Sequence, residues 1–237
     1  MNSVELSIVI PAYNEARRIG NTLAAIAAFL RQRRIAAELI VVDDGSRDGT
    51  ADVVRRHASA LELKLLTLPH NCGKGQAVRA GVLASRGRAV LICDADHATP
   101  VDEYPRLHAR LVAGADIAIG SRDLPGARLE PPQPWPRRLA AWAFRGLRRR
   151  LLLPDIRDTQ CGFKLFRGDV ARRLFAQLTT SGWLFDVEVL GLARRDGLRI
   201  AEVPVRWRDD RDSRVRPWAE LLPTLCELLR LRRRLRR

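Results

Sequence analysis

Short, mainly apolar runs alternate with segments of helical periodicity along the first half of the chain. Their length and their content of Val, Ile and Leu are typical of buried strands. The runs cover residues 6–10, 38–43, 63–68, 89–93 and 116–120. Between the first two runs, apolar residues recur at the spacing of an amphipathic helix, at Ile19, Leu23, Ile26, Ala27 and Leu30. This alternation predicts an α/β fold with a Rossmann-like, mostly parallel sheet flanked by helices.

The pattern changes after residue 123. Five prolines at residues 124–136 predict a loop, and a basic helix is expected from about residue 136 to 152. We expect the remaining elements to be a strand-like segment at 158–166, helices near 168–177 and 183–195, and a strand near 199–205. Three aromatic residues of this half, Trp183, Phe185 and Trp207, are expected in the core rather than at a ligand.

Polar residues follow several of the predicted strands at the point where each strand ends. They lie at residues 11–15, 43–44, 94–96 and 121–122. Right-handed crossovers place the carboxyl ends of parallel strands on one edge of a sheet, where α/β proteins bind their ligands. The sequence therefore predicts one site built from these four segments.

Asp94 and Asp96 are the centre of this predicted site, because they follow a buried strand directly and are one residue apart. Two carboxylates so placed suit Mg²⁺ or Mn²⁺ carrying a diphosphate. His97 comes next and is expected to be a loop side chain rather than a metal ligand.

The charge of the chain points to an anionic partner. The net charge is +15, and two segments hold most of it: residues 137–157 have seven arginines and one acidic residue, and residues 216–237 have seven arginines and two glutamates. Such localised basic surfaces bind nucleic acid, phosphorylated substrates or anionic lipid. A basic face that serves only solubility is the alternative.

The last helix is expected to begin near residue 217 and to combine a Trp/Leu face with arginines. This composition favours a helix lying on anionic lipid, with packing on its own domain as the alternative. We accordingly expect a catalytic domain at residues 1–215 and a membrane-surface helix and tail at 216–237. No run of about 18 apolar residues or signal peptide is evident, so we expect a cytoplasmic protein peripheral to the membrane.

Several classes of protein lack support in the sequence. No G-x-G-x-x-G follows the first strand and no complete P-loop is present, since residues 73–75 (GKG) are only a fragment of one. The four cysteines match no metal-ligand spacing. A basic nucleic-acid-binding module remains a competing hypothesis from the charge alone; no motif supports it, and we expect no nucleic-acid partner.

Taken together in this order, the motifs resemble those of family 2 glycosyltransferases, which have the GT-A fold. They are residues 8–15 (IVIPAYNE), 41–50 (VVDDGSRDGT), 71–75 (NCGKG) and 94–96 (DAD). The second half is similar to polyprenyl-phosphate glycosyltransferases, most of all the dolichyl-phosphate β-glucosyltransferases and next the dolichyl-phosphate mannose synthases. It contributes residues 158–166 (DTQCGFKLF), 183–188 (WLFDVE), 202–207 (EVPVRW) and 212–214 (DSR).

The resemblance implies roles for individual residues. Asp94 and Asp96 would meet the cation and the sugar-nucleotide diphosphate, beside the Ala95 backbone, and Arg122 would face the reacting phosphates. The residues implied for the nucleoside pocket are Pro11, Tyr13, Glu15, Val42 and Asp44. Three others are expected near the phosphates or the acceptor: Arg138 on the basic helix, with Arg137 as the alternative, then Gln160, and Arg214 on a loop closing over the diphosphate. For Asp158, Gln160 and Glu188, a buried polar network and a direct catalytic role are equally open.

The implied reaction is attack of a polyprenyl-phosphate oxygen on the anomeric carbon of a nucleotide-sugar, with inversion. Two departures from mannose synthases, Ala98 in place of a polar residue and no clear second arginine near residues 209–210, agree with the glucosyltransferase branch. We expect UDP-glucose as donor, with GDP-mannose as the alternative, and undecaprenyl or dolichyl phosphate as acceptor. A soluble transferase with a water-soluble acceptor is a further alternative.

Overall fold

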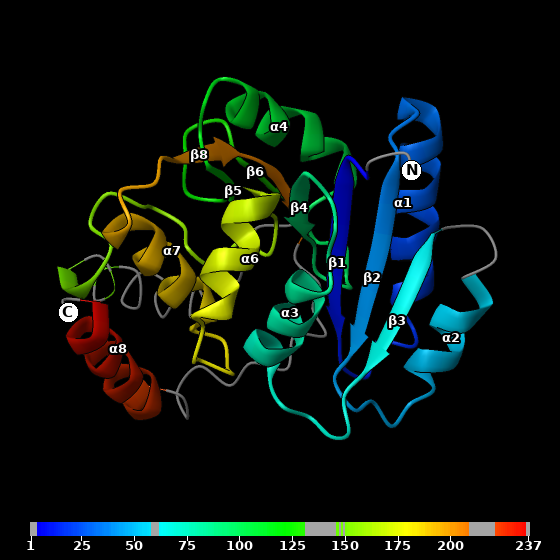
Figure 1. Cartoon of the computed structure of the whole chain (residues 1–237), viewed down its shortest axis with the longest axis horizontal. Coiled ribbons are helices and arrows are strands. Elements are labelled where there is room, and N and C mark those ends of the chain that lie inside the picture. The colour runs from blue at the N-terminus through cyan, green and yellow to red at the C-terminus, as the bar shows by residue number, and fades with distance from the viewer. Residues whose placement is uncertain are drawn as a thin grey trace.

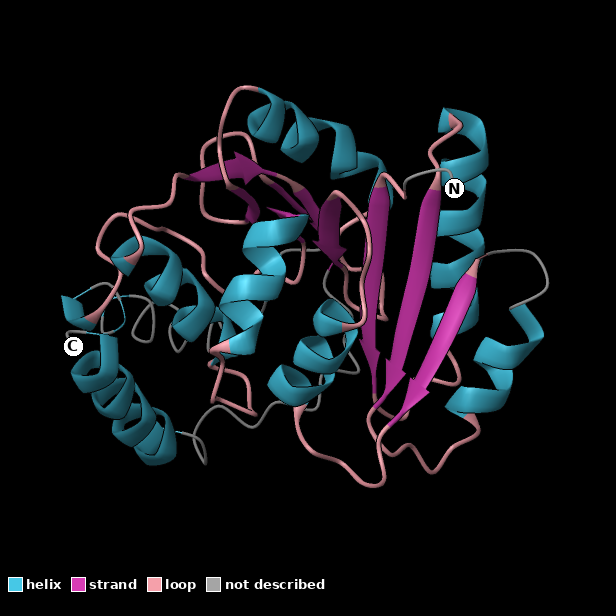
Figure 2. Ribbon diagram, viewed as in Figure 1, coloured by secondary structure: helices cyan, strands magenta, loops and turns pink. Residues whose placement is uncertain are grey.

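A seven-stranded sheet forms the centre of the molecule (Figures 1 and 2). The computed structural model describes residues 4–57, 62–130, 146, 148, 150–208 and 221–235. The strands of this sheet, in spatial order, are β3 (Leu63–Thr67), β2 (Ala37–Asp43), β1 (Leu6–Ala12), β4 (Ala89–Ile92), β7 (Lys164–Arg167), β5 (Ile117–Ser121) and β8 (Ile200–Pro204). All neighbours pair in parallel except β7, which is antiparallel to both β4 and β5. The predicted mostly parallel sheet is therefore confirmed.

Helices cover both faces of this sheet (Figure 1). One face packs against α1 (Ile19–Arg33), α2 (Thr50–His57) and α4 (Tyr104–Val112), the last preceded by the short helix η2 (Val101–Glu103). The other face packs against α3 (Lys74–Leu83), α6 (Gly168–Ala176) and α7 (Phe185–Arg195). A small parallel pair, β6 (Arg128–Glu130) and β9 (Arg206–Arg208), lies outside the main sheet.

The central strands β1, β2 and β4 are mainly apolar in sequence because both of their faces are buried. In β1, Ile8 and Ile10 pack into the core on the α1 side, whereas Val9 packs into the core on the α3 side. Successive side chains of a strand point to opposite faces, so each face of the sheet receives every second residue.

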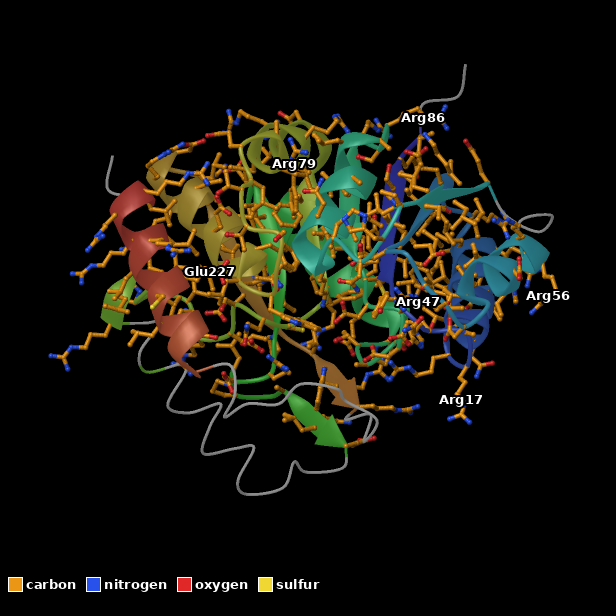
Figure 3. The ribbon with its side chains drawn as sticks, turned by 90° about the horizontal axis from the view of Figure 1, so that it is seen from below. Arg17, Arg47, Arg56, Arg79, Arg86 and Glu227 are labelled. Carbon is orange, nitrogen blue, oxygen red and sulfur yellow. The ribbon has the colours of Figure 1, made fainter. Side chains whose placement is uncertain are left out.

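The carboxyl ends of β1, β2 and β4 lie on one edge of the sheet, as predicted. Pro11 pairs with Val42 in the register of β1 and β2, and Val9 pairs with Ile92 of β4. Figure 3 looks onto this edge from below, with arginines such as Arg17 and Arg56 pointing outward at its periphery. The loops that follow these three strands are therefore neighbours.

Residues 158–166 differ from the prediction of a strand-like segment. Only its last part is in a strand, β7, and residues 158–163 form a loop. The Asp158 carboxylate accepts hydrogen bonds from its own segment, at the Gln160 N–H, and from the Arg122 N–H. Local side-chain-to-backbone bonds of this kind compete with a strand ladder. The basic helix expected at about 136–152 falls largely outside the described residues.

The C-terminal helix α8 (Leu221–Leu235) packs against α7. Leu228 and Leu231 are buried in the same core cluster as the α7 side chains. A Cβ at Gly191 of α7 would overlap with Leu235. Arg234 donates hydrogen bonds to the buried Glu188 carboxylate and to the Gln177 carbonyl oxygen.

Leu228 and Leu231 are thus covered by the protein itself, which corrects the expectation that this part of the helix rests on lipid, whereas Leu229 of the expected lipid-facing set is 39% exposed. Packing on its own domain, the alternative interpretation, is what the structure shows for Leu228, Leu231 and Leu235. The expected boundary at residues 215 and 216 falls outside the described part of the chain. None of the helices in that part combines the length and hydropathy that a membrane span requires.

Candidate functional site

The loops after β1 and β2 are joined to each other by hydrogen bonds. Asn14 has a positive φ of 55°; its N–H donates to Ser46 Oγ, and its Oδ1 accepts from the Arg47 N–H at 2.8 Å. The Glu15 N–H donates to Thr50 Oγ1 at 2.8 Å. These bonds fix one wall of the site.

The residues expected in a nucleoside pocket come together on this wall. The side chains of Pro11 and Val42 are buried, so they shape the wall but offer little surface to a ligand. Tyr13 is 37% exposed, and Glu15 forms an ion pair with Arg18 at 2.6 Å. Tyr13 and Glu15 are therefore the parts of this set that a ligand can reach.

Asp44 holds the glycine turn at residues 71–75 against the end of β2. Its two carboxylate oxygens accept the N–H groups of Cys72 and Gly73 at 2.7 and 3.0 Å. Burial raises the pKa of this carboxyl, and the two N–H donors oppose the shift. The first role of Asp44 in the structure is thus to position the turn that carries Lys74.

Asp94 and Asp96 stand at the end of β4 on a loop held from three sides. The Ala95 carbonyl oxygen accepts a hydrogen bond from Thr22 of α1, and Asp96 Oδ1 accepts the Ala98 N–H at 3.0 Å. A Cβ at Gly162 would overlap with Asp94 Oδ2, so the loop before β7 packs directly against this carboxylate. The geometry of the carboxylate pair is thus set by α1, β4 and the 158–163 loop together.

His97 is a loop side chain, as expected. Its Nε2 accepts the N–H of Val101 at 2.9 Å, and its backbone has a positive φ of 54°. Burial lowers the pKa of this imidazole, which favours the neutral form that accepts this bond. His97 therefore shapes the turn into η2.

Lys74 lies in the candidate site although the sequence did not single it out as a site residue. Its Nζ lies 2.7 Å from Asp94 Oδ1, and its side chain is only 16% exposed. Burial alone would lower the pKa of Lys74, but the carboxylates of Asp94, Asp186 and Asp96 raise it overall. The signal in the sequence was a lysine between two glycines at the start of a helix, and only the packing of α3 brings it to Asp94.

A second buried ion pair lies behind Lys74. Lys164 Nζ is 2.6 Å from Asp186 Oδ1, and it donates to the Cys161 carbonyl oxygen. Burial raises the pKa of Asp186, and the charges of Lys164 and Lys74 oppose the shift. Four side chains thus alternate in charge across the fold: Lys164 of β7, Asp186 of α7, Lys74 of α3 and Asp94 after β4.

Arg122 follows β5 and is held by Asp158. The guanidinium donates to both oxygens of the Asp158 carboxylate, at 2.7 and 2.9 Å, and lies over the Trp207 ring at 5.3 Å from its centroid. Burial would raise the pKa of Asp158, but Arg122 holds it well below its ordinary range. Arg122 is 23% exposed, so part of the guanidinium still faces solvent.

Asp158 and Glu188 belong to two separate polar networks. Asp158 orients Arg122. The fully buried Glu188 accepts hydrogen bonds from the N–H groups of Thr179 and Thr180 and forms an ion pair with Arg234. The Gln160 N–H donates to Asp158, and its side chain is half-buried. For Asp158 and Glu188 the structure therefore supports the interpretation of a buried network.

Two expected site residues, Arg138 and Arg214, lie outside the described residues. The last described residue before Arg214 in the sequence is Arg208, at the end of β9. There the Arg208 N–H donates to the Ala98 carbonyl oxygen at 2.8 Å, beside the carboxylate pair.

The residues present fit a divalent cation that is bound partly by the protein and partly by a substrate. Burial and the neighbouring Asp94 charge raise the pKa of Asp96, so a cation between the carboxylates would relieve their repulsion. No group of three or more His, Cys, Asp and Glu side chains in the described part of the chain is arranged so that it could hold a metal ion by itself. Mg²⁺ sites of this kind use one or two carboxylates and complete the shell with substrate phosphates and water.

Comparison with solved structures supports the fold. Glucosyl-3-phosphoglycerate synthase from Mycobacterium tuberculosis, solved with Mn²⁺, UDP-glucose and phosphoglyceric acid, superimposes with a TM-score of 0.71 at 22% identity, over 96% of this chain and 79% of that one. Mannosyl-3-phosphoglycerate synthase from Rubrobacter xylanophilus gives a TM-score of 0.70 at 21% identity, over 98% and 74% of the two chains. The predicted GT-A fold is confirmed.

Comparison with curated sequences gives closer relatives. Dolichyl-phosphate beta-glucosyltransferase from Drosophila melanogaster is 40% identical over 91% of this chain and 71% of its own length. The enzymes of the same name from Homo sapiens and Dictyostelium discoideum are 37% and 35% identical, over 97% and 98% of this chain and 75% of their own length. The model of glycosyl transferase family 2 matches residues 7–175. The chain is thus a glycosyltransferase and belongs to glycosyl transferase family 2.

Proposed function

We propose that this glycosyltransferase transfers glucose from UDP-glucose to a polyprenyl phosphate, with inversion at the anomeric carbon. The observation that carries the proposal is the ion pair between Lys74 and Asp94, next to Asp96 at the end of β4. Arg122 follows β5, which runs in the same direction as β4 in this sheet and so ends at the same edge. The names of the relatives, dolichyl-phosphate beta-glucosyltransferases, support the choice of sugar and acceptor.

A divalent cation, Mg²⁺ or Mn²⁺, is part of this proposal. Asp94 and Asp96 would hold it, and when bound it would neutralise charge on the departing diphosphate. The protein's own part is to keep the two carboxylates in place, through the Thr22 bond to Ala95 and the contact of Gly162 with Asp94.

The reaction needs no strong general base. A phosphate monoester has a second pKa of about 6 and is largely dianionic at pH 7. One of its oxygens forms the bond to the anomeric carbon, while the bond from that carbon to the diphosphate oxygen breaks and its electron pair leaves with the nucleoside diphosphate. The acceptor phosphate becomes a diester, and no proton has to move. What the site must supply is positive charge for two anions, which Lys74 and Arg122 provide.

A donor and acceptor screen tests this function. UDP-glucose, GDP-mannose and UDP-galactose are offered with undecaprenyl phosphate, and in parallel with 3-phosphoglycerate, each with Mg²⁺ or Mn²⁺. We expect labelled lipid with UDP-glucose. Transfer to 3-phosphoglycerate alone would replace the lipid acceptor by a water-soluble one, and a preference for GDP-mannose would change the sugar.

Asp96→Asn tests the carboxylate pair in the same assay. We expect turnover to fall by on the order of a thousandfold, and Mn²⁺ binding measured by electron paramagnetic resonance to weaken in parallel. Asp52→Asn on the exposed face of α2 is the matched control and should change neither. Normal turnover in Asp96→Asn would contradict the proposal that Asp94 and Asp96 hold a divalent cation.

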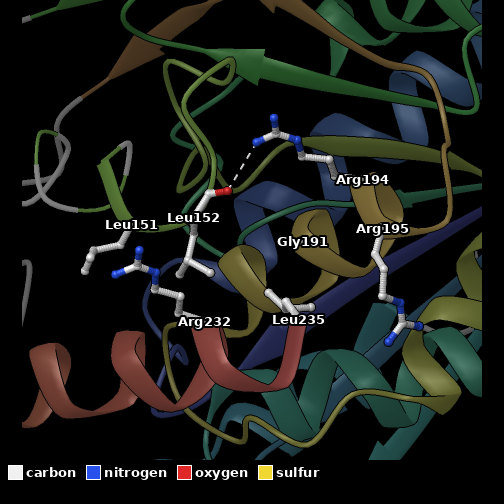
Figure 4. Close-up of a pocket in the computed structure, with 7 residues that line it drawn as sticks. All are labelled: Leu151, Leu152, Gly191, Arg194, Arg195, Arg232 and Leu235. Carbon is white, nitrogen blue, oxygen red and sulfur yellow. Dashed lines mark hydrogen bonds between the residues drawn. The ribbon is translucent and has the colours of Figure 1, made fainter. Parts of the chain in front are cut away.

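We also propose that the protein works at the cytoplasmic face of a membrane, held by its basic surface. Leucine and arginine side chains from both basic segments and from α7 line a pocket of about 370 Å³ (Figure 4). Its lining is Leu151, Leu152, Gly191, Arg194, Arg195, Arg232 and Leu235. Apolar stems with guanidinium heads suit the boundary between lipid headgroups and acyl chains.

Vesicle co-sedimentation tests this location. We expect binding to vesicles with anionic phosphatidylglycerol, weak binding to neutral phosphatidylcholine vesicles, and a loss with added salt. Arg232→Gln should weaken binding more than Arg233→Gln, because Arg232 lines the pocket and Arg233 on the same helix is exposed. Equal binding to both kinds of vesicle would contradict the electrostatic attachment.

A further inference from the structure

We propose that Lys74 and Trp183 together form the subsite for the acceptor, with Lys74 at its phosphate and the Trp183 ring under its first apolar unit. The proposal rests on the proposed function, because it assumes an acceptor that joins a phosphate directly to an apolar chain. It adds to the site a tryptophan that was expected in the core, and it assigns the charge of Lys74 to the acceptor.

Trp183 is held out of the core while its neighbours enter it. The indole is 59% exposed, whereas Leu184 and Phe185, the next two residues, are 3% and 1% exposed. A large aromatic side chain left in solvent loses the free energy of burial that its neighbours gain. An exposed ring beside a catalytic site is therefore a candidate for ligand contact.

The ring lies directly beside the charged part of the site. Lys74 Nζ is 5.0 Å from the centroid of the Trp183 ring and 2.7 Å from Asp94 Oδ1. The lysine thus connects the aromatic surface to the carboxylate expected to hold the cation. A ligand on the ring would have its polar end within reach of both.

The backbone that carries Trp183 is fixed. The Ser181 carbonyl oxygen accepts the Gly75 N–H at 2.7 Å, and a Cβ at Gly73 or Gly75 would collide with the backbone of Ser181 or Thr180. On the other side, Glu188 accepts the Thr180 N–H at 2.7 Å. The glycines of the turn thus allow the 179–183 segment to lie against α3, and the exposure of Trp183 follows from this arrangement.

The combination of an ammonium group and an indole ring favours the acceptor, rather than the hexose of the donor, as the ligand bound by Lys74 and Trp183. A hexose is neutral and can stack on an aromatic ring without a neighbouring ammonium group. A prenyl phosphate has an anion and an apolar chain on adjacent atoms, which match an ammonium and an indole placed side by side. The donor's diphosphate has its own partner in the cation expected at Asp94 and Asp96. Once that cation takes over the charge of Asp94, the ammonium of Lys74, which pairs with Asp94 in this structure, can attract a second anion.

Binding of a short acceptor can be followed by tryptophan fluorescence without turnover. Farnesyl phosphate is titrated into the full-length protein, with farnesol, inorganic phosphate and UDP-glucose plus Mn²⁺ as separate probes. We expect quenching by farnesyl phosphate that is lost in Trp183→Phe, and weaker binding of farnesol and of phosphate alone. Quenching at Trp183 by the donor complex in place of farnesyl phosphate would assign the ring to the hexose and overturn the proposal.

Steady-state kinetics supplies the second measurement. Trp183→Ala and Lys74→Met should each raise the acceptor KM by about tenfold, which corresponds to one aromatic or charged contact. The donor KM should stay within about twofold in Trp183→Ala. Val112→Ala, at an exposed apolar residue on α4, is the control and should change neither constant.

The two proposals fail in different ways. If labelled lipid forms but Trp183→Ala leaves the acceptor KM unchanged, the subsite is wrong and the proposed function stands. If no donor labels lipid and farnesyl phosphate does not bind, the function and the subsite fall together. Circular dichroism and thermal unfolding of each variant show that the fold is intact, and Trp183→Phe retains an aromatic ring should Trp183→Ala be unstable.

Discussion

Lys74 Nζ lies 2.7 Å from Asp94 Oδ1, so an ammonium group borders the carboxylate pair that is expected to hold a divalent cation. An ammonium at this distance neutralises Asp94 and repels a second cation. The same group can be attracted by the phosphates of a substrate once the cation is bound. Lys74 therefore has opposite effects on binding of the metal alone and on the reaction.

Lys74→Met should tighten Mn²⁺ binding in the absence of donor, while it lowers turnover. The gain should be on the order of fivefold, because one unit charge at about 4 Å is worth about 1 kcal/mol even in water. Electron paramagnetic resonance of free Mn²⁺ measures the affinity. Lys64→Met, at an exposed residue of β3, is the matched control and should leave it unchanged. Weaker Mn²⁺ binding in Lys74→Met would mean that Lys74 supports the metal site.

Gly162→Ala tests the support behind Asp94. A Cβ at this position would overlap with Asp94 Oδ2, so the carboxylate has to move. We expect turnover to fall about a hundredfold, as a displacement of about 1 Å at a reacting centre can cause, and Mn²⁺ binding to weaken with it. Gly182→Ala, where a Cβ meets no atom within 4 Å, should leave Mn²⁺ binding unchanged. Equal Mn²⁺ affinity in the two variants would show that the 158–163 loop does not position Asp94.

The parallel part of the fold could be predicted from the sequence because it depends on local pattern. The apolar runs that form β1, β2 and β4 are buried on both faces, and the polar residues after them follow from the way parallel strands end. For this reason the sequence alone is enough to assign Tyr13, Asp44 and Asp94 to one edge of the sheet.

The position of β7 could not be predicted in the same way. Residues 164–167 enter the sheet between β4 and β5 in the antiparallel direction, far along the chain from both. That pairing is set by contacts across the fold, and four residues carry too little pattern to indicate it. The ion pair of Lys164 with Asp186 depends on this insertion and was missed for the same reason.

Two side chains of the site were missed because their environment is tertiary. Hydrophobicity alone places Trp183 in the core, but Leu184 and Phe185 occupy the core there and leave the indole outside. Lys74 is twenty residues from Asp94 in the sequence, and the contact depends on the packing of α3, whose preceding glycine turn is bound by Asp44.

Asp158→Asn should destabilise the protein in a pH-dependent way. Breaking a buried ion pair costs about 3 kcal/mol, and Asp158 is almost fully buried against Arg122. Because Arg122 lowers the pKa of Asp158 in the folded state, its stabilisation is complete above the unfolded pKa of about 3.9 and is lost as the pH falls below it. Urea unfolding at pH 7 and pH 3 should therefore show a larger difference from the wild type at pH 7.

The reverse pH trend, with a larger difference at pH 3, would contradict the ion pair. Turnover separates this structural effect from catalysis. Since Asp158 orients the Arg122 guanidinium, turnover in Asp158→Asn should fall even at temperatures where the variant is fully folded. Asp155→Asn removes an exposed carboxylate that pairs with Arg194 and is the matched control for both measurements.

The packing of α8 on α7 can be tested with two leucines of the same helix. Leu231 is 4% exposed against α7 and Leu229 is 39% exposed, so Leu231→Ala should lower the free energy of unfolding by about 2–3 kcal/mol and Leu229→Ala by less than about 1 kcal/mol. Urea denaturation without lipid measures both. A helix that packs only on lipid would give two small and equal losses in that experiment. If instead the difference is found and vesicle binding survives Leu231→Ala, the membrane contact of α8 comes from its arginines.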